Sequence, residues 1–562
     1  MSAQTMEASE SNGNQSSVAE SELIDGLKPV TIDTTHCDDN IDMLRIMMPY
    51  MRWKQIHPRP PNQPCDIYWH YDTFFDQTGI TSGQVNRFPG SREICQKINL
   101  SRWMNLMQSL YPEEYNFMPK TYLLPEQMEE FTKEVNSTKG QAERPVFIVK
   151  PSDGHRGIGV YMMMDMDSFT DEADDHYVAQ EYATDIFTMD GLKFDLRIHA
   201  VIRSISPLEF YICEEGQVRF ATVPYTKPTA DNLELGFMHL TNLMVNTKNE
   251  NYVVSNEDNK GSSRLVTSWL AQLRREGKDT EKLWNKIELL VTKTLLAMAP
   301  QMLVDYRQAI PDDESGPTCF QIVGFDILLR NDLEPLLLEV NHDPNLRILD
   351  AVKTASGEMK KEFSLKSFNI RRRLFRDTML LVTPPDRYAR PRGQPKLFSE
   401  KEAEGKTKGP AVEQDVAGDE KSSLIQLLPK RYGDRLQPYR TLERVAEIYN
   451  ASLSEKGATR MGQTAFNDFA RKCELNKAMS ESELEKLYRS TEQANSHLNP
   501  QGTSGLCFFA FVSACSKMAA AAYPSVPLAA QMSTLAQNCE RLLGLPGLKP
   551  GSYTNSSSVP ER

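Results

Sequence analysis

Apolar residues in the middle of the chain gather in short runs that polar segments separate. Between about 291 and 303 the apolar positions follow a helical repeat instead. Strand-like runs that alternate with helices are typical of an α/β (α+β) body with one large core. Six runs predict strands, at 146–149, 160–164, 194–202, 208–213, 323–329 and 336–340.

The C-terminal part of the chain carries a second helical pattern. Apolar residues over 442–449 and again over 466–473 recur at i, i+3, i+4 and i+7, as on one face of a helix. We therefore expect an all-helical module over 424–543. The loop 454–463 offers Glu455 as its one acidic residue, so a calcium-binding EF-hand is not expected there.

Composition separates this ordered body from its flanks. The first 41 residues hold eight acidic side chains and one lysine. Such a segment buries too little apolar surface to offset the entropy of the chain. The expected organisation is a disordered acidic tail over 1–41, an N-terminal domain over 42–144, the main α/β region over 145–382, a charged proline-rich linker over 383–423, the helical module over 424–543 and a disordered tail over 544–562.

Charge and cysteine usage limit the classes of protein to consider. The 64 basic and 76 acidic residues give a net charge of −12, so the chain should not coat nucleic acid or anionic lipid. The nine cysteines contain no CxxC pair and indicate a reducing compartment. Without a signal peptide or a membrane-length apolar run, we expect a soluble intracellular protein with no membrane insertion.

The first of three polar clusters follows the apolar strand that ends at Lys150. A loop with Gly154, Gly157 and Gly159 comes next and leads into another apolar run. Glycines let backbone N–H groups approach phosphate oxygens, and the lysine adds a positive charge. The cluster predicts a phosphate-binding lid; the alternative is a plain hairpin turn with a salt-bridged lysine.

The second cluster alternates charged and apolar residues. Lys193, Asp195, Arg197 and His199 are spaced two apart, so on a strand they share one face while the apolar residues between them pack against the core. Mixed charges beside bulky core residues favour the floor of a cleft that holds a polyphosphate. The alternative is a solvated strand at the edge of a sheet.

The third cluster joins two apolar strands. If these pair about the point between Asp332 and Leu333, Asp326 lies opposite Glu339, and Asn341 points to the same side. Two carboxylates and an amide on one face suit a hard cation such as Mg²⁺. The alternative is a hydrogen-bonded structural pair.

In this order the clusters resemble an ATP-grasp ligase, and more narrowly the tubulin tyrosine ligase-like family. The resemblance covers about 66–382, and the module after Leu424 resembles that of a polyglutamylase branch. Five motifs carry it: Gln84–Gly90, Lys150–Ser152, Lys193–Arg197, His239–Asn242 and Glu339–Asn341.

The resemblance implies roles for particular residues, with Lys150, Lys193, Arg219 and Glu339 as the catalytic set. ATP would contact Lys97, Lys150, Arg156, Gly157, Gln180, Glu181, Tyr182, Ala183, Lys193, Asp195, Thr241 and Asn242. Mg²⁺ would bind Asp326, Glu339 and Asn341. The amino acid and its acceptor would contact Arg197, Arg219, Leu243, Ser263, Arg264, His342 and Arg371.

Departures from the family pattern concern the amino-acid pocket. Leu243-Met244 and Ser263 stand where the family commonly has Tyr-Ser and a lysine, and Arg371 or Lys366 is expected to replace a substrate-contacting lysine. Because Gln180 and His342 resemble glutamate-adding members, the resemblance implies a tubulin polyglutamylase. The alternatives are ligation of glycine or tyrosine, a substrate other than tubulin, and an inactive microtubule-binding protein.

A local basic segment could reconcile an acidic chain with an acidic partner. Residues 366–396 contain nine Lys and Arg against two Asp, a local charge of +7. We expect this segment to bind tubulin tails on microtubules; the alternative is a solvated basic helix end. The resemblance also implies a monomer in the cytoplasm and cytoskeleton, with the cilium or basal body as further sites, and no nucleic-acid partner.

Overall fold

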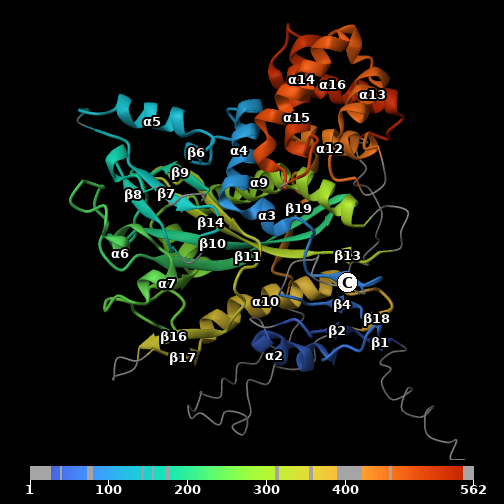
Figure 1. Cartoon of the computed structure of the whole chain (residues 1–562). Coiled ribbons are helices and arrows are strands. Elements are labelled where there is room, and N and C mark those ends of the chain that lie inside the picture. The colour runs from blue at the N-terminus through green and yellow to red at the C-terminus, as the bar shows by residue number, and fades with distance from the viewer. Residues whose placement is uncertain are drawn as a thin grey trace, which may run out of the picture.

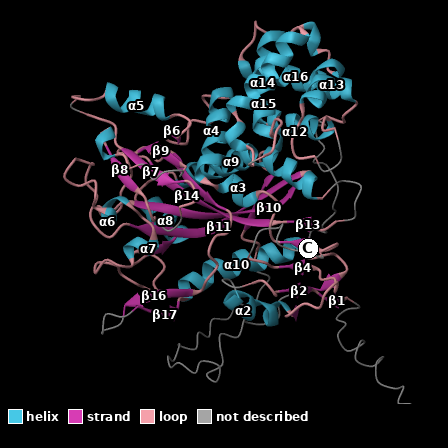
Figure 2. Cartoon of the chain, viewed as in Figure 1, coloured by secondary structure: helices cyan, strands magenta, loops and turns pink. Residues whose placement is uncertain are grey.

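The computed structural model in Figure 1 describes most of the chain. The described residues are 27–37, 41–71, 80–141, 143–154, 157–170, 176–310, 316–353, 359–388, 421–454, 458–500 and 502–547. Figure 2 shows strands in the middle of the body, helices around them, and a cluster of helices formed by the C-terminal part.

A large antiparallel sheet forms the centre of the body. Its strands run in the order β12-β11-β10-β14-β15, and β19 pairs with the edge of β11 that faces away from β10. The bounds are β10 Phe194–Ile205, β11 Leu208–Phe220, β12 Ser263–Leu265, β14 Gln321–Leu329, β15 Pro335–Asn341 and β19 Leu424–Leu428. Helices cover both faces of this sheet, with α9 (Thr280–Ala309) on one and α10 (Leu365–Val382) on the other (Figure 1).

A smaller antiparallel sheet lies beside the first. Its order is β6-β9-β7-β8, with bounds β6 Thr121–Leu124, β7 Phe147–Pro151, β8 Tyr161–Met163 and β9 Tyr177–Glu181. Helix α5 (Met128–Ser137) packs on it through Phe131, whose ring meets that of Phe147 edge to face at 5.1 Å. All six predicted strands are confirmed, and the predicted helix 291–303 lies within α9.

The N-terminal strands correct the predicted tail. A parallel sheet in the order β13-β5-β4-β2-β3 includes residues of the tail expected to be disordered. Val30 and Ile32 of that segment are completely buried. Order therefore begins before Ile41, while residues 1–26 lie outside the described part. The bounds are β1 Lys28–Pro29, β2 Thr31–Asp33, β3 Lys54–Ile56, β4 Ile67–Tyr68, β5 Gln84–Val85, β13 Thr318–Cys319 and α2 Ile41–Met51.

Smaller elements complete the body. Strand β1 pairs with β18, so part of the predicted linker 383–423 is ordered. The remaining bounds are α3 Ser91–Cys95, α4 Lys97–Leu110, η2 Met166–Ser168, α6 Gly236–His239, α7 Leu243–Asn246, α8 Val266–Arg275, β16 Leu349–Lys353, β17 Met359–Phe363 and β18 Arg387–Tyr388.

The C-terminal module is helical, as predicted, except at its start. Because β19 joins the central sheet, the expectation of an all-helical module from residue 424 is wrong at that boundary. The helices are α11 Gly433–Leu436, η3 Gln437–Tyr439, α12 Thr441–Ala451, α13 Gln463–Lys472, η4 Leu475–Lys477, α14 Glu481–Ala494, η5 Ser496–Leu498, α15 Phe508–Ala522 and α16 Leu528–Leu543.

The module and the body share one apolar core. The ring of Trp103 on α4 stacks on Phe508 at 5.5 Å and meets Phe509 edge to face at 5.2 Å. On α9, Glu288 accepts a hydrogen bond of 2.7 Å from the Tyr432 hydroxyl. The module is therefore packed as part of the body.

Helix α9 is long and apolar enough to cross a membrane, but most of it is buried inside the fold. Its polar residue Lys293 pairs with Glu114 at 2.5 Å. These are features of a core helix. All nine cysteines are buried and free, so the prediction of no disulfide framework is confirmed.

Candidate active site

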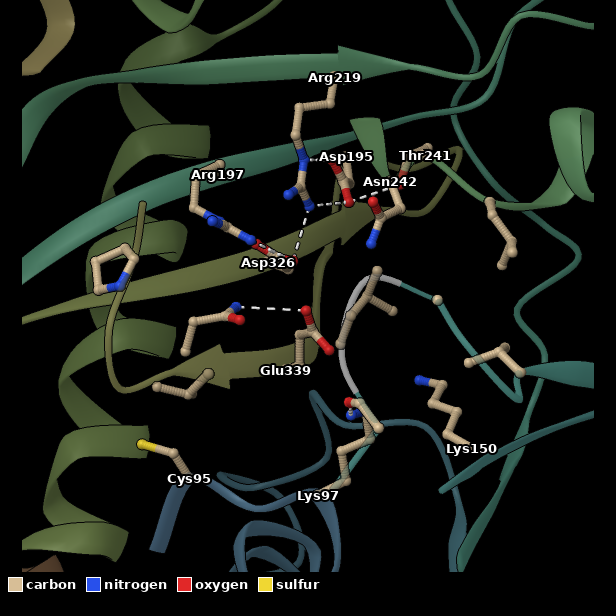
Figure 3. A pocket seen from close by; sticks show the side chains of 18 of the residues that line it. Cys95, Lys97, Lys150, Asp195, Arg197, Arg219, Thr241, Asn242, Asp326 and Glu339 are labelled. Carbon is tan, nitrogen blue, oxygen red and sulfur yellow. Dashed lines mark hydrogen bonds and ion pairs between the residues drawn. The ribbon is translucent and has the colours of Figure 1, made fainter. Parts of the chain in front are cut away.

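The two antiparallel sheets and the helices α3, α4 and α7 enclose a cavity of about 810 Å³. Figure 3 shows side chains from these elements pointing into it. Lys193, Asp195, Arg197 and His199 all line the cavity, so the predicted polar face of this strand is confirmed.

Strand register explains why the charged side chains meet. Asp195 and Arg197 on β10 lie opposite Arg219 on β11 and Asp326 on β14, respectively. Asp326 in turn lies opposite Glu339 on β15, as we predicted. Two neighbouring rows of residues across four strands therefore bring five charged groups to the same place.

Asp326 lies between two guanidinium groups. Arg197 Nε and Nη2 donate to its carboxylate at 2.5 and 2.9 Å, and Arg219 Nη2 approaches its Oδ2 at 2.8 Å. Arg219 also holds Asp195 in a fork of 2.7 and 2.5 Å. Burial opposes ionisation, but Arg197 and Arg219 hold the pKa of Asp326 well below its usual range.

Glu339 has the opposite environment. Burial and the neighbouring charge of Asp326 raise the pKa of Glu339 above its ordinary value. Asn341 Nδ2 donates to Glu339 Oε1 at 3.3 Å. The pairing shifts by one residue beyond Asp326, which leaves Leu338 as an extra residue and makes a β-bulge beside Glu339.

These three residues fit a hard cation. Two carboxylates of like charge and an amide oxygen lie on adjacent strands, and a divalent ion there would offset the charge that raises the pKa of Glu339. Within the described residues, no group of three or more His, Cys, Asp or Glu is placed to hold a metal ion, so the donor set is two carboxylates and the amide of Asn341.

Lys97 and Lys150 lie across the cavity from this carboxylate pair, and Lys193 lines the cavity near Asp195. Burial lowers the pKa of Lys150 to about 8 and that of Lys193 to about 7. Lys150 Nζ donates to Gln180 Oε1 at 2.8 Å, and Lys97 donates to the carbonyl of Gly154 in the glycine loop. Buried, mutually repelling ammonium groups are suited to bind an anion.

The remaining residues expected at ATP also come together. Thr241 donates to Asp195 at 2.6 Å, and Gly157 has a left-handed backbone (φ 77°) where an added Cβ would lie 3.3 Å from Val245. Arg156 lies outside the described residues. The further cavity-lining residues from the prediction are Gln180, Glu181, Tyr182, Ala183 and Asn242.

The residues predicted for the amino-acid pocket do not all lie at the cavity. Five of them line the cavity: Arg197, Arg219, Leu243, His342 and Arg371.

Ser263 and Arg264 are not among the residues that line the cavity, so their role at the substrate stays a prediction. Ser263 accepts a hydrogen bond of 2.6 Å from Gln217 on the neighbouring strand. Arg264 pairs with Asp190 at 2.8 Å and covers the ring of Phe220 at 4.3 Å. Both residues belong to the edge strand β12.

Sequence reasoning missed other lining residues. Arg87 pairs with Asp343 at 2.6 Å, and Gln217 and His239 reach the cavity from β11 and α6. Arg87 and His239 lie within the family motifs Gln84–Gly90 and His239–Asn242, so these motifs could have indicated both residues. Gln217 alternates with Arg219 on a strand that we had predicted to end at 213.

The basic segment differs from the predicted docking surface. Lys366 and Arg376 are each 5% exposed; Lys366 donates to the carbonyl of Ser263 at 2.7 Å, and Arg376 pairs with Asp377 at 2.7 Å. The docking role is therefore wrong for Lys366 and Arg376, since α10 turns them into the fold. Arg371 opens into the cavity, and 389–396 lie outside the described part.

Comparison with known proteins agrees with this site. Residues 77–362 match the model of the tubulin-tyrosine ligase family. The chain belongs to this family. Its membership confirms the predicted family, the ATP-grasp type of fold and the class of ATP-dependent ligase.

Relatives within the tubulin-tyrosine ligase family match nearly the whole chain. Tubulin polyglutamylase TTLL11 of Homo sapiens is 36% identical over 530 residues, which cover 92% of this chain and 74% of the relative. The protein of that name in Mus musculus is 35% identical over 558 residues, or 92% and 76%. Tubulin polyglutamylase ttll-11 of Caenorhabditis elegans is 34% identical over 429 residues, or 74% and 59%.

The C-terminal module has a match of its own. Residues 425–554 match a model described as the EF-hand of tubulin polyglutamylase TTLL11. Our expectation that the module is not an EF-hand is therefore wrong at the level of the domain family. That expectation depended on a single acidic ligand in the loop 454–463, and a count of calcium ligands does not decide domain ancestry.

Proposed function

We propose that the protein is a tubulin polyglutamylase, which uses ATP and Mg²⁺ to join glutamate to glutamate residues of tubulin tails. The observation that carries the proposal is that one cavity is lined by Lys150 and Lys193 together with the carboxylates of Asp326 and Glu339. The names of the relatives and their coverage of the chain support the substrate.

In the proposed reaction, the terminal phosphoryl group of ATP passes to an acceptor glutamate carboxylate. The bond to ADP breaks, and an acylphosphate forms. The amine of the incoming glutamate then attacks the acyl carbon, loses a proton and displaces phosphate, which leaves an amide bond.

The protein contributes mainly charge and position to these steps. Lys150 and Lys193 would hold the phosphates and offset the charge that develops on them. When bound by Asp326, Glu339 and Asn341, Mg²⁺ would supply further positive charge at the transferred phosphoryl group.

Arginines at the cationic side of the cavity support glutamate as the added amino acid. Arg197, Arg219 and Arg371 line that side. Arg197 and Arg219 already pair with carboxylates of the site, whereas the buried Nη1 of Arg371 has no hydrogen-bond partner among the described residues. A dicarboxylate presents two anionic groups, whereas glycine and tyrosine present one, so Arg371 is available for the additional carboxylate of glutamate. The assembled carboxylates also disfavour the inactive alternative.

The test measures incorporation of labelled glutamate, glycine and tyrosine into microtubules, with and without ATP and Mg²⁺. We expect only glutamate to be incorporated, and Glu339→Gln to reduce turnover at least a thousandfold because it removes charge from the metal site. Glu334→Gln in the turn of the same hairpin is the matched control and should keep activity. Incorporation by Glu339→Gln at the control rate would contradict the metal assignment.

Three further parts of the proposal concern the cell and the assembly. We propose that the protein acts as a monomer, in the cytoplasm and on the cytoskeleton, with the cilium or basal body as additional sites. Acidic tubulin tails on microtubules would then meet the cationic side of the cavity and need no separate basic helix.

A further inference from the structure

We propose that His239 is a positioning residue for Lys193, and that it acts through the hydroxyl group of Tyr182 to orient the lysine ammonium and keep it charged at the nucleotide phosphates. This inference rests on the proposed function, in which Lys193 binds ATP. The Tyr182 hydroxyl and the His239 imidazole are not among the charged groups to which the proposed reaction assigns a role.

Four short contacts form one continuous chain from the lysine to the backbone. Lys193 Nζ lies 2.9 Å from the Tyr182 hydroxyl and 2.8 Å from the carbonyl oxygen of His239. The Tyr182 hydroxyl lies 3.0 Å from His239 Nδ1, and His239 Nε2 lies 3.0 Å from the carbonyl oxygen of Asn232. Lys193, Tyr182 and His239 are each at most 6% exposed.

The chemistry of the end group fixes the direction of this chain. A backbone carbonyl can only accept, so His239 Nε2 must carry a hydrogen and donate to Asn232. In the neutral imidazole Nδ1 then accepts from the Tyr182 hydroxyl, whose oxygen is left to accept from Lys193. Burial and the neighbouring Lys193 lower the pKa of His239, which favours this neutral form.

The direction of the chain has a consequence for the lysine. Two of its three N–H groups are held, by Tyr182 and by the His239 carbonyl, which leaves one for a ligand in the cavity. A hydroxyl that donates to an imidazole is a stronger acceptor, because hydrogen bonds in series polarise one another. The arrangement therefore stabilises the ammonium form of a buried lysine.

Other groups near Lys193 also affect the equilibrium between its charged and neutral forms, on which the Tyr182 hydroxyl acts. Asp195 favours its charged form and Lys150 opposes it, while burial lowers the pKa of Lys193 to about 7. The ring of Tyr225 also lies 6.4 Å from that of His239, but its hydroxyl donates to the carbonyl of Thr184 and stands outside the chain.

The test compares four variants of the full-length protein: Tyr182→Phe, His239→Ala, His239→Asn and the control Tyr225→Phe. Tyr182→Phe removes one oxygen and keeps the ring, so it can be measured even if His239→Ala does not fold. Calorimetric titration with a non-hydrolysable ATP analogue gives the affinity between pH 6 and pH 9. In parallel, ¹³C-lysine NMR follows the Lys193 titration without nucleotide, with Lys193→Arg used to assign the signal.

We expect Tyr182→Phe and His239→Ala to bind the analogue about tenfold more weakly than wild type at pH 7.5, the size of a lost hydrogen bond to a charged group. The deficit should shrink at pH 6, because excess protons restore the ammonium group. His239→Asn, which keeps an acceptor, should fall between His239→Ala and wild type. Tyr225→Phe should match wild type.

Two results would overturn the inference. One is an unchanged Lys193 titration in Tyr182→Phe and His239→Ala, and the other is an affinity loss that is equal at every pH, as a structural defect would give. If the wild-type protein binds no nucleotide, the proposed function fails, while the NMR titration still tests the hydrogen-bond chain.

Discussion

Asp326 and Glu339 lie opposite each other on adjacent strands, yet their surroundings shift their pKa values in opposite directions. Arg197 and Arg219 favour the ionised form of Asp326, whereas Asp326 itself disfavours the ionised form of Glu339. The negative charge of Asp326 therefore stabilises the folded state, and the negative charge of Glu339 destabilises it.

This difference predicts opposite effects of two similar substitutions. Asp326→Asn should lower the free energy of unfolding by about 3 kcal/mol, because two buried arginines lose their charged partner. Glu339→Gln should leave stability unchanged or raise it by about 1 kcal/mol, because an unfavourable buried charge is removed at an active site. Denaturant unfolding at pH 7.5 measures both.

The effect of pH separates this explanation from a packing effect. Because the folded pKa of Glu339 is raised, its ionisation costs stability as pH rises from below its ordinary value through its raised value. The Glu339→Gln variant should lose that part of the pH dependence. Equal destabilisation by both substitutions would contradict the assignment.

At this scale the sequence predicted the site well where strands are long. Period-two alternation placed Lys193, Asp195 and Arg197 on one face, and pairing about a turn placed Asp326 opposite Glu339. The sequence did not show that Ser263 lies outside the cavity lining, because β12 is a three-residue edge strand, and the position of such a strand depends on partners distant in the sequence.

Among the elements, β19 returns the chain to the central sheet after the predicted linker. Just before it, Ser423 donates from its backbone nitrogen and its hydroxyl to Asp377 Oδ2, each at 2.6 Å. The other oxygen of Asp377 accepts from Arg376 Nε at 2.7 Å. A buried carboxylate on α10 therefore fixes the point at which the chain returns to the central sheet.

Removing the Asp377 carboxylate should destabilise the segment in which Ser423 leads into β19. Asp377→Ala should lower the free energy of unfolding by about 3 kcal/mol, since Arg376 and the Ser423 donors lose a buried partner. Asp386→Ala is the matched control, because Asp386 also pairs with an arginine but is largely exposed; its effect should stay below about 0.5 kcal/mol. Similar unfolding midpoints for the two variants would contradict this role.

Short elements also show where prediction from sequence ends. The strands β1 and β2 have two and three residues, and their order comes from pairing with β18, β3 and β4. A window of sequence with many acidic residues carries no sign of such partners. The bulge at Leu338 was missed for a similar reason, since it changes the pairing without changing the alternation.

On the scale of the whole molecule, the module and the ligase body depend on the same core. Helix α4 carries Lys97 at one end of the cavity, and its Trp103 lies against Phe508 and Phe509 of the module. Arg431 also pairs with Glu288 on the core helix α9 at 2.9 Å. Net charge and segment composition do not predict this shared core, because both average over residues that lie in different parts of the fold.

We therefore predict that the ligase body is not soluble by itself. A chain ending at Ser423 would expose the buried Trp103 and the edge of β11, and an apolar patch of this kind promotes aggregation. A chain ending at Gly547 should remain monodisperse in size-exclusion chromatography. A monodisperse, folded product from the shorter chain would contradict the shared core.

The pairing of β19 with β11 also bears on how the protein withstands cleavage. A protease that cuts once between 389 and 420 would separate the covalent chain into two pieces. The second piece would still begin with a strand bound into the sheet of the first and carry a helical face packed against α4 and α9. The nicked protein should thus migrate as one particle until it is denatured.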